Sequence, residues 1–224
     1  MKNKKQKLFC ISAIFLFAFL IWTLLLLWVD AAEVGPLGTQ VGLSTFNLWA
    51  AGLIGVNMAL YTLTDIMMLL PILFAGGFAA LGLYQLIRRK GLFKVDPDIL
   101  ALGGFYIAVI LCFLLFEIAA INYRPVLIDG ALEVSYPSST TLVFMTVMPS
   151  AALQLKERIK GRLAKVIAVS LISAITLLAV VARILSGVHW ITDIIGGILL
   201  SCGLVFLYAG VCGALTSHIS RQSS

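Results

Sequence analysis

The sequence predicts an all-α polytopic membrane protein, a bundle of six transmembrane helices in one domain over residues 1–224. Of its residues, 61% are hydrophobic and 12% are charged, whereas a soluble domain carries roughly 25% charged residues. Apolar runs recur at about the 20 residues that a helix needs to cross a bilayer. No stretch alternates with the period of a strand, and lipid admits only helices or closed barrels.

The apolar runs predict six spans, at residues 8–29, 62–87, 99–120, 138–155, 164–184 and 189–213. The first run follows a basic head, so a cleaved signal peptide is the alternative. Its apolar part is longer than a signal core, and no A-x-A-like site follows at once, which favours a retained span.

The segment between the first two spans becomes amphipathic over about residues 44–56. This pattern predicts a short helix that lies at the membrane interface, capped by Ser44, with Trp49 at the depth of the headgroups. The alternative is an ordinary extracytoplasmic loop.

The basic residues predict the orientation of the spans. Fourteen of the sixteen Lys and Arg fall on one side of a chain that crosses six times, and the positive-inside rule makes that side the cytoplasm. Both termini are then cytoplasmic. The net charge of +6 reflects this topology, so the predicted partners are the bilayer and a membrane lipid rather than nucleic acid. The remaining two, Arg124 and Arg183, lie at the opposite face.

Two loops at that extracytoplasmic face carry residues suited to binding a phosphate. One contributes Arg124 and leads into the hydroxyl-rich start of the fourth span, and the other contributes Arg183 and His189. Arginine presents a planar fork of donors that matches phosphate oxygens. Free N–H groups and the dipole at a helix start favour an anion. The predicted donors at that helix start are Ser138, Ser139 and Thr140.

His189 and Asp193 lie four residues apart, which places them on one face of a helix. A histidine beside two arginines can be the nucleophile of phosphoryl transfer. Asp193 can accept a hydrogen bond from the imidazole and fix its tautomer, leaving the other ring nitrogen free to attack. Taken singly, these side chains have structural explanations, such as capping or snorkelling. The sequence predicts neither a metal nor a cofactor.

These residues resemble the type 2 phosphatidic acid phosphatase (PAP2) superfamily, which shares its site with vanadium haloperoxidases. The family motifs are K-x6-R-P, P-S-G-H and S-R-x5-H-x3-D. Here the third motif reads A-R-ILSGV-H-WIT-D over residues 182–193, with both spacings intact. The first motif ends in Arg124-Pro125 and the second begins in Pro137-Ser138. The resemblance covers roughly residues 60–213.

The resemblance implies an integral membrane lipid phosphatase that forms a phosphohistidine. Arg124, Ser138 and Arg183 would hold the phosphate, His189 would be the nucleophile, and Asp193 would orient it. The substrate would be a lipid phosphate or diphosphate, of the phosphatidic acid or polyprenyl diphosphate type. The alternative is a degenerate relative that binds or moves a phospholipid without hydrolysis. A purely structural subunit explains neither the two arginines nor the Arg–His–Asp spacing.

Four positions depart from the family motifs: Ala182 replaces the leading Ser of the third motif, Glu117 the Lys, Ser139 the Gly, and Thr140 the His that protonates the leaving group. A neutral threonine is a very poor general acid, and a general acid is worth about 10²–10⁴-fold. In a lipid diphosphate the leaving group is itself a phosphate, already a stable anion, so the hypothesis is a preference for lipid diphosphates. Glu117 is a candidate substitute acid if its pKa is raised; the alternative is that it pairs with Arg124 or Arg183.

Overall fold

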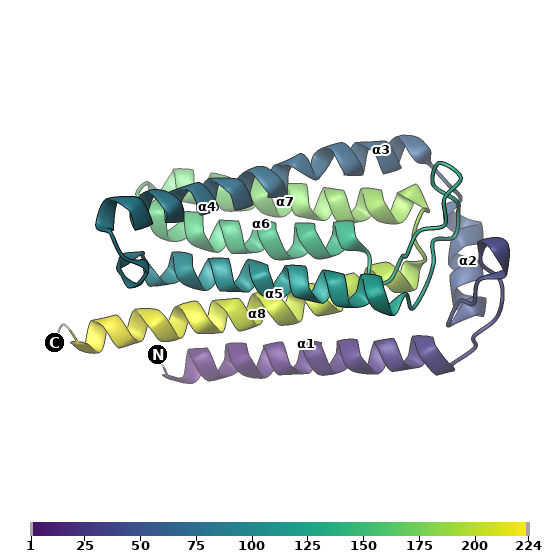
Figure 1. Cartoon of the computed structure of the whole chain (residues 1–224), viewed down its shortest axis with the longest axis horizontal. Coiled ribbons are helices and arrows are strands. Elements are labelled where there is room, and N and C mark those ends of the chain that lie inside the picture. The colour runs from purple at the N-terminus through teal and green to yellow at the C-terminus, as the bar shows by residue number, and fades with distance from the viewer. Residues whose placement is uncertain (1, 223–224) are drawn as a thin grey trace.

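The computed structural model describes residues 2–222, and the side chains of residues 5–215. Long helices run side by side along one axis (Figure 1). They are α1 (Lys2–Trp28), α4 (Leu69–Arg89), α5 (Pro97–Ala119), α6 (Ser139–Arg158), α7 (Arg162–Ser186) and α8 (Ile191–Gln222), with α3 (Met58–Met67) preceding α4. The predicted all-α membrane fold is confirmed.

Five segments of the described chain have the length and apolar composition of a membrane span, and α6 is not among them. The reason is its polar content, because much of the helix is buried against other helices rather than exposed to lipid. α6 lies in the middle of the bundle, between α5 and α7 (Figure 1). Its buried polar residues are Thr140, Thr141, Thr146, Ser150 and Gln154. A hydropathy criterion therefore misses the central helix α6, although α6 packs as a sixth member of the bundle.

The described chain begins and ends at the same end of the bundle, where the α4–α5 and α6–α7 turns also lie (Figure 1). Two of the connections contain a short 3-10 turn. η2 (Leu92–Lys94) lies between α4 and α5 at the end with the termini, and η1 (Pro36–Gly38) lies between α1 and α2 at the opposite end. The predicted clusters of basic residues belong to the end that holds the termini. The α5–α6 loop and the α7–α8 turn lie at the other end. Which end faces the cytoplasm stays a prediction.

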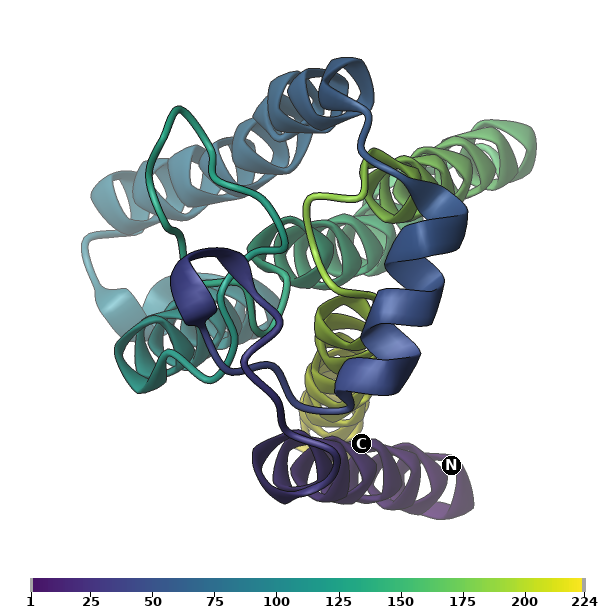
Figure 2. The same ribbon diagram turned by 90° about the vertical axis from the view of Figure 1, so that its right-hand side faces the viewer.

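The short helix α2 (Ser44–Ile54) lies across the end of the bundle opposite the termini (Figure 2). Its cap differs from the predicted one, because Ser44 is already helical. Asp30 provides the cap instead: its Oδ2 accepts from the backbone N–H of Thr45 at 2.8 Å and its Oδ1 from the Ser44 hydroxyl at 3.1 Å. These hydrogen bonds lower the pKa of Asp30. Trp49 is 61% exposed, and its place at a membrane interface stays a prediction.

A close backbone contact fixes the turn that leads from α7 to α8. Gly187 ends α7 with φ of 65°, a left-handed conformation that glycine adopts at helix C-termini without a Cβ penalty. A Cβ at this position would lie 1.8 Å from the carbonyl oxygen of Gly55. The neighbouring Asn57 N–H donates to the carbonyl of Ser186 at 2.9 Å. Only glycine therefore fits where the α2–α3 link crosses the end of α7.

We expect Gly187→Ala to lower the melting temperature of the detergent-solubilised protein by several degrees. The left-handed backbone alone costs an L-residue about 1–2 kcal/mol, and the clash with Gly55 adds to this. Gly52→Ala is the matched control, because a Cβ at Gly52 meets nothing within 4 Å and its φ is not positive. Equal melting temperatures for the two variants would contradict the packing described at Gly187.

Candidate functional site

The α5–α6 loop folds into a short hairpin that delivers site residues from both of its arms. Isolated antiparallel bridges pair Tyr123 with Val134 and Ile128 with Ala131. At the tip, Asp129 and Gly130 have φ of 50° and 78°, the positive values that a type I′ turn requires and that an Asp-Gly pair favours. This pairing places Asn122 and Arg124 on one arm beside Glu133 and Ser135 on the other. The backbone N–H of Arg124 donates to the carbonyl of Glu133, and that of Ser135 donates to the carbonyl of Asn122.

His189 lies in the turn between α7 and α8 and is 6% exposed. Its Nε2 is 3.3 Å from Nη2 of Arg183, and its Nδ1 is 2.8 Å from the hydroxyl oxygen of Ser135. Burial, and then the positive charges of Arg124 and Arg183, hold the pKa of His189 well below its ordinary value of 6.5. The imidazole is therefore neutral at pH 7, the form in which a ring nitrogen is nucleophilic.

Asp193, in the first turn of α8, is fully buried and accepts three hydrogen bonds. Its Oδ1 accepts from the side-chain amide of Asn122 at 3.0 Å. Its Oδ2 accepts from the backbone N–H of Trp190 at 3.1 Å and from the hydroxyl of Ser135 at 2.5 Å. The predicted direct hydrogen bond to His189 is not formed, because Nδ1 and Oδ2 are 3.9 Å apart and Ser135 bonds to both.

Arg183, in the last turn of α7, is almost wholly buried and contacts α3. Its Nη1 donates to the hydroxyl of Thr64 at 2.9 Å and to Oδ1 of Asp65 at 3.0 Å. Its other terminal nitrogen faces His189. The guanidinium group is thus fixed by α3 on one side while it approaches the imidazole on the other.

Tyr61 of α3 lies beside both predicted arginines. The guanidinium carbon of Arg183 is 5.0 Å from the centre of its ring, and that of Arg124 is 5.8 Å away. Both distances lie within the range of cation–π attraction. The two cations, 59 positions apart in the sequence, therefore share one aromatic ring, which offsets part of their mutual repulsion.

Several guanidinium donors at this site have no hydrogen-bond acceptor among the described residues. They are Nε and Nη1 of Arg124 and Nε of Arg183, all buried. Nε of Arg124 lies 2.8 Å from Oε2 of Glu133, but the N–H does not point at the oxygen, so the contact is an ion pair only. An unpaired buried donor costs about 1–3 kcal/mol, and more when charged. Such donors favour an incoming anion.

The start of α6 meets the start of α8. The backbone N–H of Ser138 donates to the carbonyl of Asp193 at 3.1 Å, and the Ser138 hydroxyl accepts from Oγ1 of Thr141 at 3.1 Å. Ser138 is the N-cap of α6, and the N–H groups of the first turn have no partner within a helix. Phosphate binding by Ser138, Ser139 and Thr140 stays a prediction.

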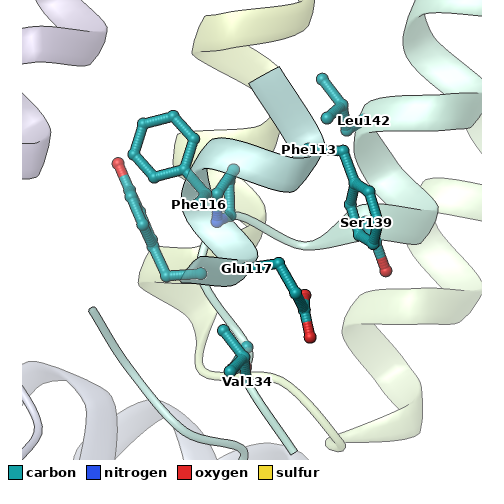
Figure 3. Close-up of a pocket in the computed structure, with 9 residues that line it drawn as sticks. Phe113, Phe116, Glu117, Val134, Ser139 and Leu142 are labelled. Carbon is teal, nitrogen blue, oxygen red and sulfur yellow. The ribbon is translucent and has the colours of Figure 1, made fainter. Parts of the chain in front are cut away.

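Glu117 lies in the last turn of α5, where its side chain is exposed. It lines a small pocket together with Ser135 and Ser139 (Figure 3). The carboxylates within ion-pair distance of Arg124 and Arg183 are Glu133 and Asp65. The pocket lining includes Ser135, which contacts Nδ1 of the imidazole, and Ser139, one of the predicted phosphate donors. A role for Glu117 as an acid stays a prediction.

A sequence model of the PAP2 superfamily matches residues 101–215, just over half of the chain. The chain belongs to the PAP2 superfamily. Its fold is similar to that of the crystal structure of a transmembrane PAP2 type phosphatidylglycerolphosphate phosphatase from Bacillus subtilis, with a TM-score of 0.62 and 20% identity over 91% of this chain and 96% of that one. A search of curated protein sequences gave no significant match.

The PAP2 region contains every site residue that the sequence predicts, from Glu117 to Asp193. It does not include α3, whose Tyr61, Thr64 and Asp65 contact the two arginines. The sequence did not single these three out, nor Asn122 and Ser135, because isolated polar residues near a helix or loop carry no signal of a contact far along the chain. Ser135 has only a weak signal, its place two residues before Pro137 of the second motif.

Proposed function

We propose that this PAP2 protein is an integral membrane lipid phosphatase, which removes phosphate from a lipid phosphate or diphosphate through a phosphohistidine formed on His189. The supporting observation is that Nε2 of a buried imidazole faces Arg183 at 3.3 Å where arginine donors lack protein acceptors. Family membership and the similar fold of a phosphatase that acts on a lipid phosphate support the substrate class.

In the proposed reaction, Arg124, Arg183 and the start of α6 at Ser138 bind the phosphate oxygens and neutralise their charge. Nε2 of His189 then attacks phosphorus, so an N–P bond forms while the P–O bond to the leaving group breaks. Water next attacks phosphorus, the N–P bond breaks, and inorganic phosphate leaves. The imidazole returns to its neutral form. The protons of the attacking water leave with the phosphate, and the protein contributes positioning and charge neutralisation to each step.

The leaving group decides which substrates suit this site. Thr140, in the first turn of α6, has no titratable group with which to protonate an alkoxide. In the described structure the carboxylates that pair with Arg124 and Arg183 are Glu133 and Asp65 rather than Glu117. We therefore favour a lipid diphosphate, such as a polyprenyl diphosphate, whose leaving group is already a stable anion.

The membrane orientation is part of the same proposal. The site lies at the end of the bundle opposite the termini (Figure 1), and the predicted clusters of Lys and Arg lie at the terminal end. With the positive-inside rule, both termini are cytoplasmic and the site opens on the extracytoplasmic face, where a lipid headgroup in the outer leaflet reaches it.

The proposed function can be tested with the purified protein in detergent. The measurement is phosphate release from a panel of lipid monophosphates and diphosphates. We expect turnover on at least one diphosphate. Lipid binding together with zero turnover over the whole panel would contradict hydrolysis. That outcome would instead support a relative that binds or moves phospholipid, the alternative that the replaced Lys and His suggest.

The pH dependence of kcat/KM should reflect the lowered pKa of His189. Because the attacking imidazole must be neutral, we expect activity to hold as the pH falls through 6.5 and to decline only well below it. The same shift lowers stability below pH 6.5, since the unfolded chain binds a proton there that the folded site does not. Values of kcat/KM for a lipid diphosphate between pH 4 and 8, corrected for the titration of the substrate phosphate itself, test this. An acidic limb centred near 6.5 would contradict the desolvated, arginine-flanked imidazole.

A further inference from the structure

The hydrogen-bond directions around His189 can be assigned by elimination. Arginine only donates, so Nη2 of Arg183, 3.3 Å from Nε2, requires an acceptor lone pair on that nitrogen. A neutral imidazole carries its single proton on the other nitrogen, Nδ1. Nδ1–H therefore donates to the hydroxyl oxygen of Ser135, 2.8 Å away. These contacts select the tautomer with its lone pair on Nε2, the nitrogen that attacks in the proposed reaction once a phosphate takes over the hydrogen bond from Arg183.

The same elimination extends from Ser135 to Asp193. The hydroxyl of Ser135 accepts from the imidazole, so its own proton is available to Oδ2 of Asp193 at 2.5 Å. Asp193 also accepts hydrogen bonds from the amide of Asn122 and the N–H of Trp190. An ionised carboxylate acts only as an acceptor, so these contacts are those expected of the charged form. All the members of this chain are buried. Water therefore does not compete with it.

We propose that Ser135 is a positioning residue for the reaction, which links the nucleophile His189 to Asp193 and transmits the influence of the carboxylate to the imidazole. Asp193 acts on the ring through this hydroxyl, because the direct separation of 3.9 Å is too long for a hydrogen bond. This inference rests on the proposed phosphohistidine reaction.

The chemical consequence appears when the N–P bond forms. Attack by Nε2 leaves the phosphorylated ring with a positive charge and its proton still on Nδ1. Ser135 accepts that N–H and in turn donates to the Asp193 carboxylate, so the developing charge is stabilised through two hydrogen bonds without any net proton transfer. On hydrolysis of the N–P bond the ring becomes neutral again with the same tautomer, ready for the next cycle.

The test compares Ser135→Ala with Ser135→Thr, measuring kcat and KM separately on a lipid diphosphate. Outer hydrogen-bond partners of functional histidines are worth about 10–100-fold, so we expect Ser135→Ala to lower kcat by this factor with KM little changed. Ser135→Thr keeps a hydroxyl and should restore most of the rate. Ser201→Ala is the matched control, because Ser201 is also fully buried but its hydroxyl bonds only to the carbonyl of Leu142.

A double-mutant cycle shows whether Asp193 acts on the imidazole through Ser135 or whether the two residues contribute to activity independently. If Asp193 acts through Ser135, the Ser135→Ala/Asp193→Asn double variant loses no more activity than Asp193→Asn alone. Losses that multiply would overturn the inference, as would full activity of Ser135→Ala. Should Ser135→Ala fail to fold, Ser135→Cys keeps the side-chain volume with a weaker hydrogen bond, and its kcat must still fall.

The outcomes also separate this inference from the proposed function. If His189→Ala is inactive while Ser135→Ala retains the full rate, the role of Ser135 is refuted and the phosphatase proposal stands. If the unmodified protein hydrolyses nothing in the panel, the proposed function fails and the inference fails with it.

Discussion

We expect His189→Ala to abolish phosphate release while leaving the protein folded. Removal of a catalytic nucleophile or base costs on the order of 10⁶-fold in kcat, because the N–P bond can no longer form and no other described group lies against Arg183 in the same position. Phosphate release from the best lipid substrate measures the loss. A second measurement is direct: the phosphorylated enzyme, trapped during turnover, should carry an acid-labile and alkali-stable bond, as an N–P bond does.

The sequence supplies its own control, because it contains only two histidines. His218 lies beyond the residues whose side chains the structure describes and has no proposed role. His218→Ala should therefore keep both turnover and the trapped phosphoenzyme, whereas His189→Ala should lose both. A phosphoenzyme that survives in the His189→Ala protein, or normal hydrolysis by it, would rule out the mechanism.

The bundle and its two extra arginines could be predicted from the sequence because the bilayer imposes strict rules. Helices that face lipid are long and apolar, and Lys and Arg are biased toward one side; the polar central helix α6 is the exception among the helices of the bundle. Arg124 and Arg183 do not follow that charge pattern, and they lie near the same tyrosine ring in the structure. The spacing of His189 and Asp193 predicted that they share one face of a helix, which is wrong for His189, because it lies in the turn before α8 begins at Ile191; the two side chains nevertheless lie close together.

What the sequence could not supply is the set of partners that hold these residues. Thr64 reaches Arg183 across 119 positions, and Asn122 reaches Asp193 across 71. Neither contact follows from a helical or strand period, which relates only residues a few positions apart. The interposed Ser135 is the same kind of case, since helical spacing predicts that His189 and Asp193 share a face but not what lies between them.

The ion pairs of the arginines have a consequence for substrate binding. Asp65 and Glu133 neutralise part of the charge of Arg183 and Arg124, so an arriving phosphate competes with two carboxylates. Both carboxylates are more than 40% exposed, so they can turn into water, and the negative charge of the phosphate would replace theirs beside the buried guanidinium groups. The arginines are buried and stay in place. The two arginines are therefore already in position to bind a phosphate, whereas Asp65 and Glu133 would move when it binds.

We expect the protein to hydrolyse a lipid diphosphate about 10²–10⁴-fold faster than the monophosphate of the same lipid, the range that a general acid is worth. The reason is Thr140, which cannot protonate an alkoxide, whereas a phosphate leaving group needs no proton. The measurement is kcat/KM for the two substrates, matched in hydrocarbon chain so that membrane binding is the same. Comparable values would contradict the argument from the leaving group.

The variant Thr140→His tests the same argument by adding a general acid instead of removing one. An imidazole at this position should raise the monophosphate rate and leave the diphosphate rate little changed, so the ratio between the two should fall. Thr140→Asn has comparable bulk without a titratable group and should not reproduce the effect. If the ratio in the unmodified protein is already near one and rises in Glu117→Gln because the monophosphate rate falls, the exposed carboxylate at the end of α5 supplies the proton. The leaving group would then be protonated from the Ser135 side of the ring, and the preference for diphosphates would have no physical cause.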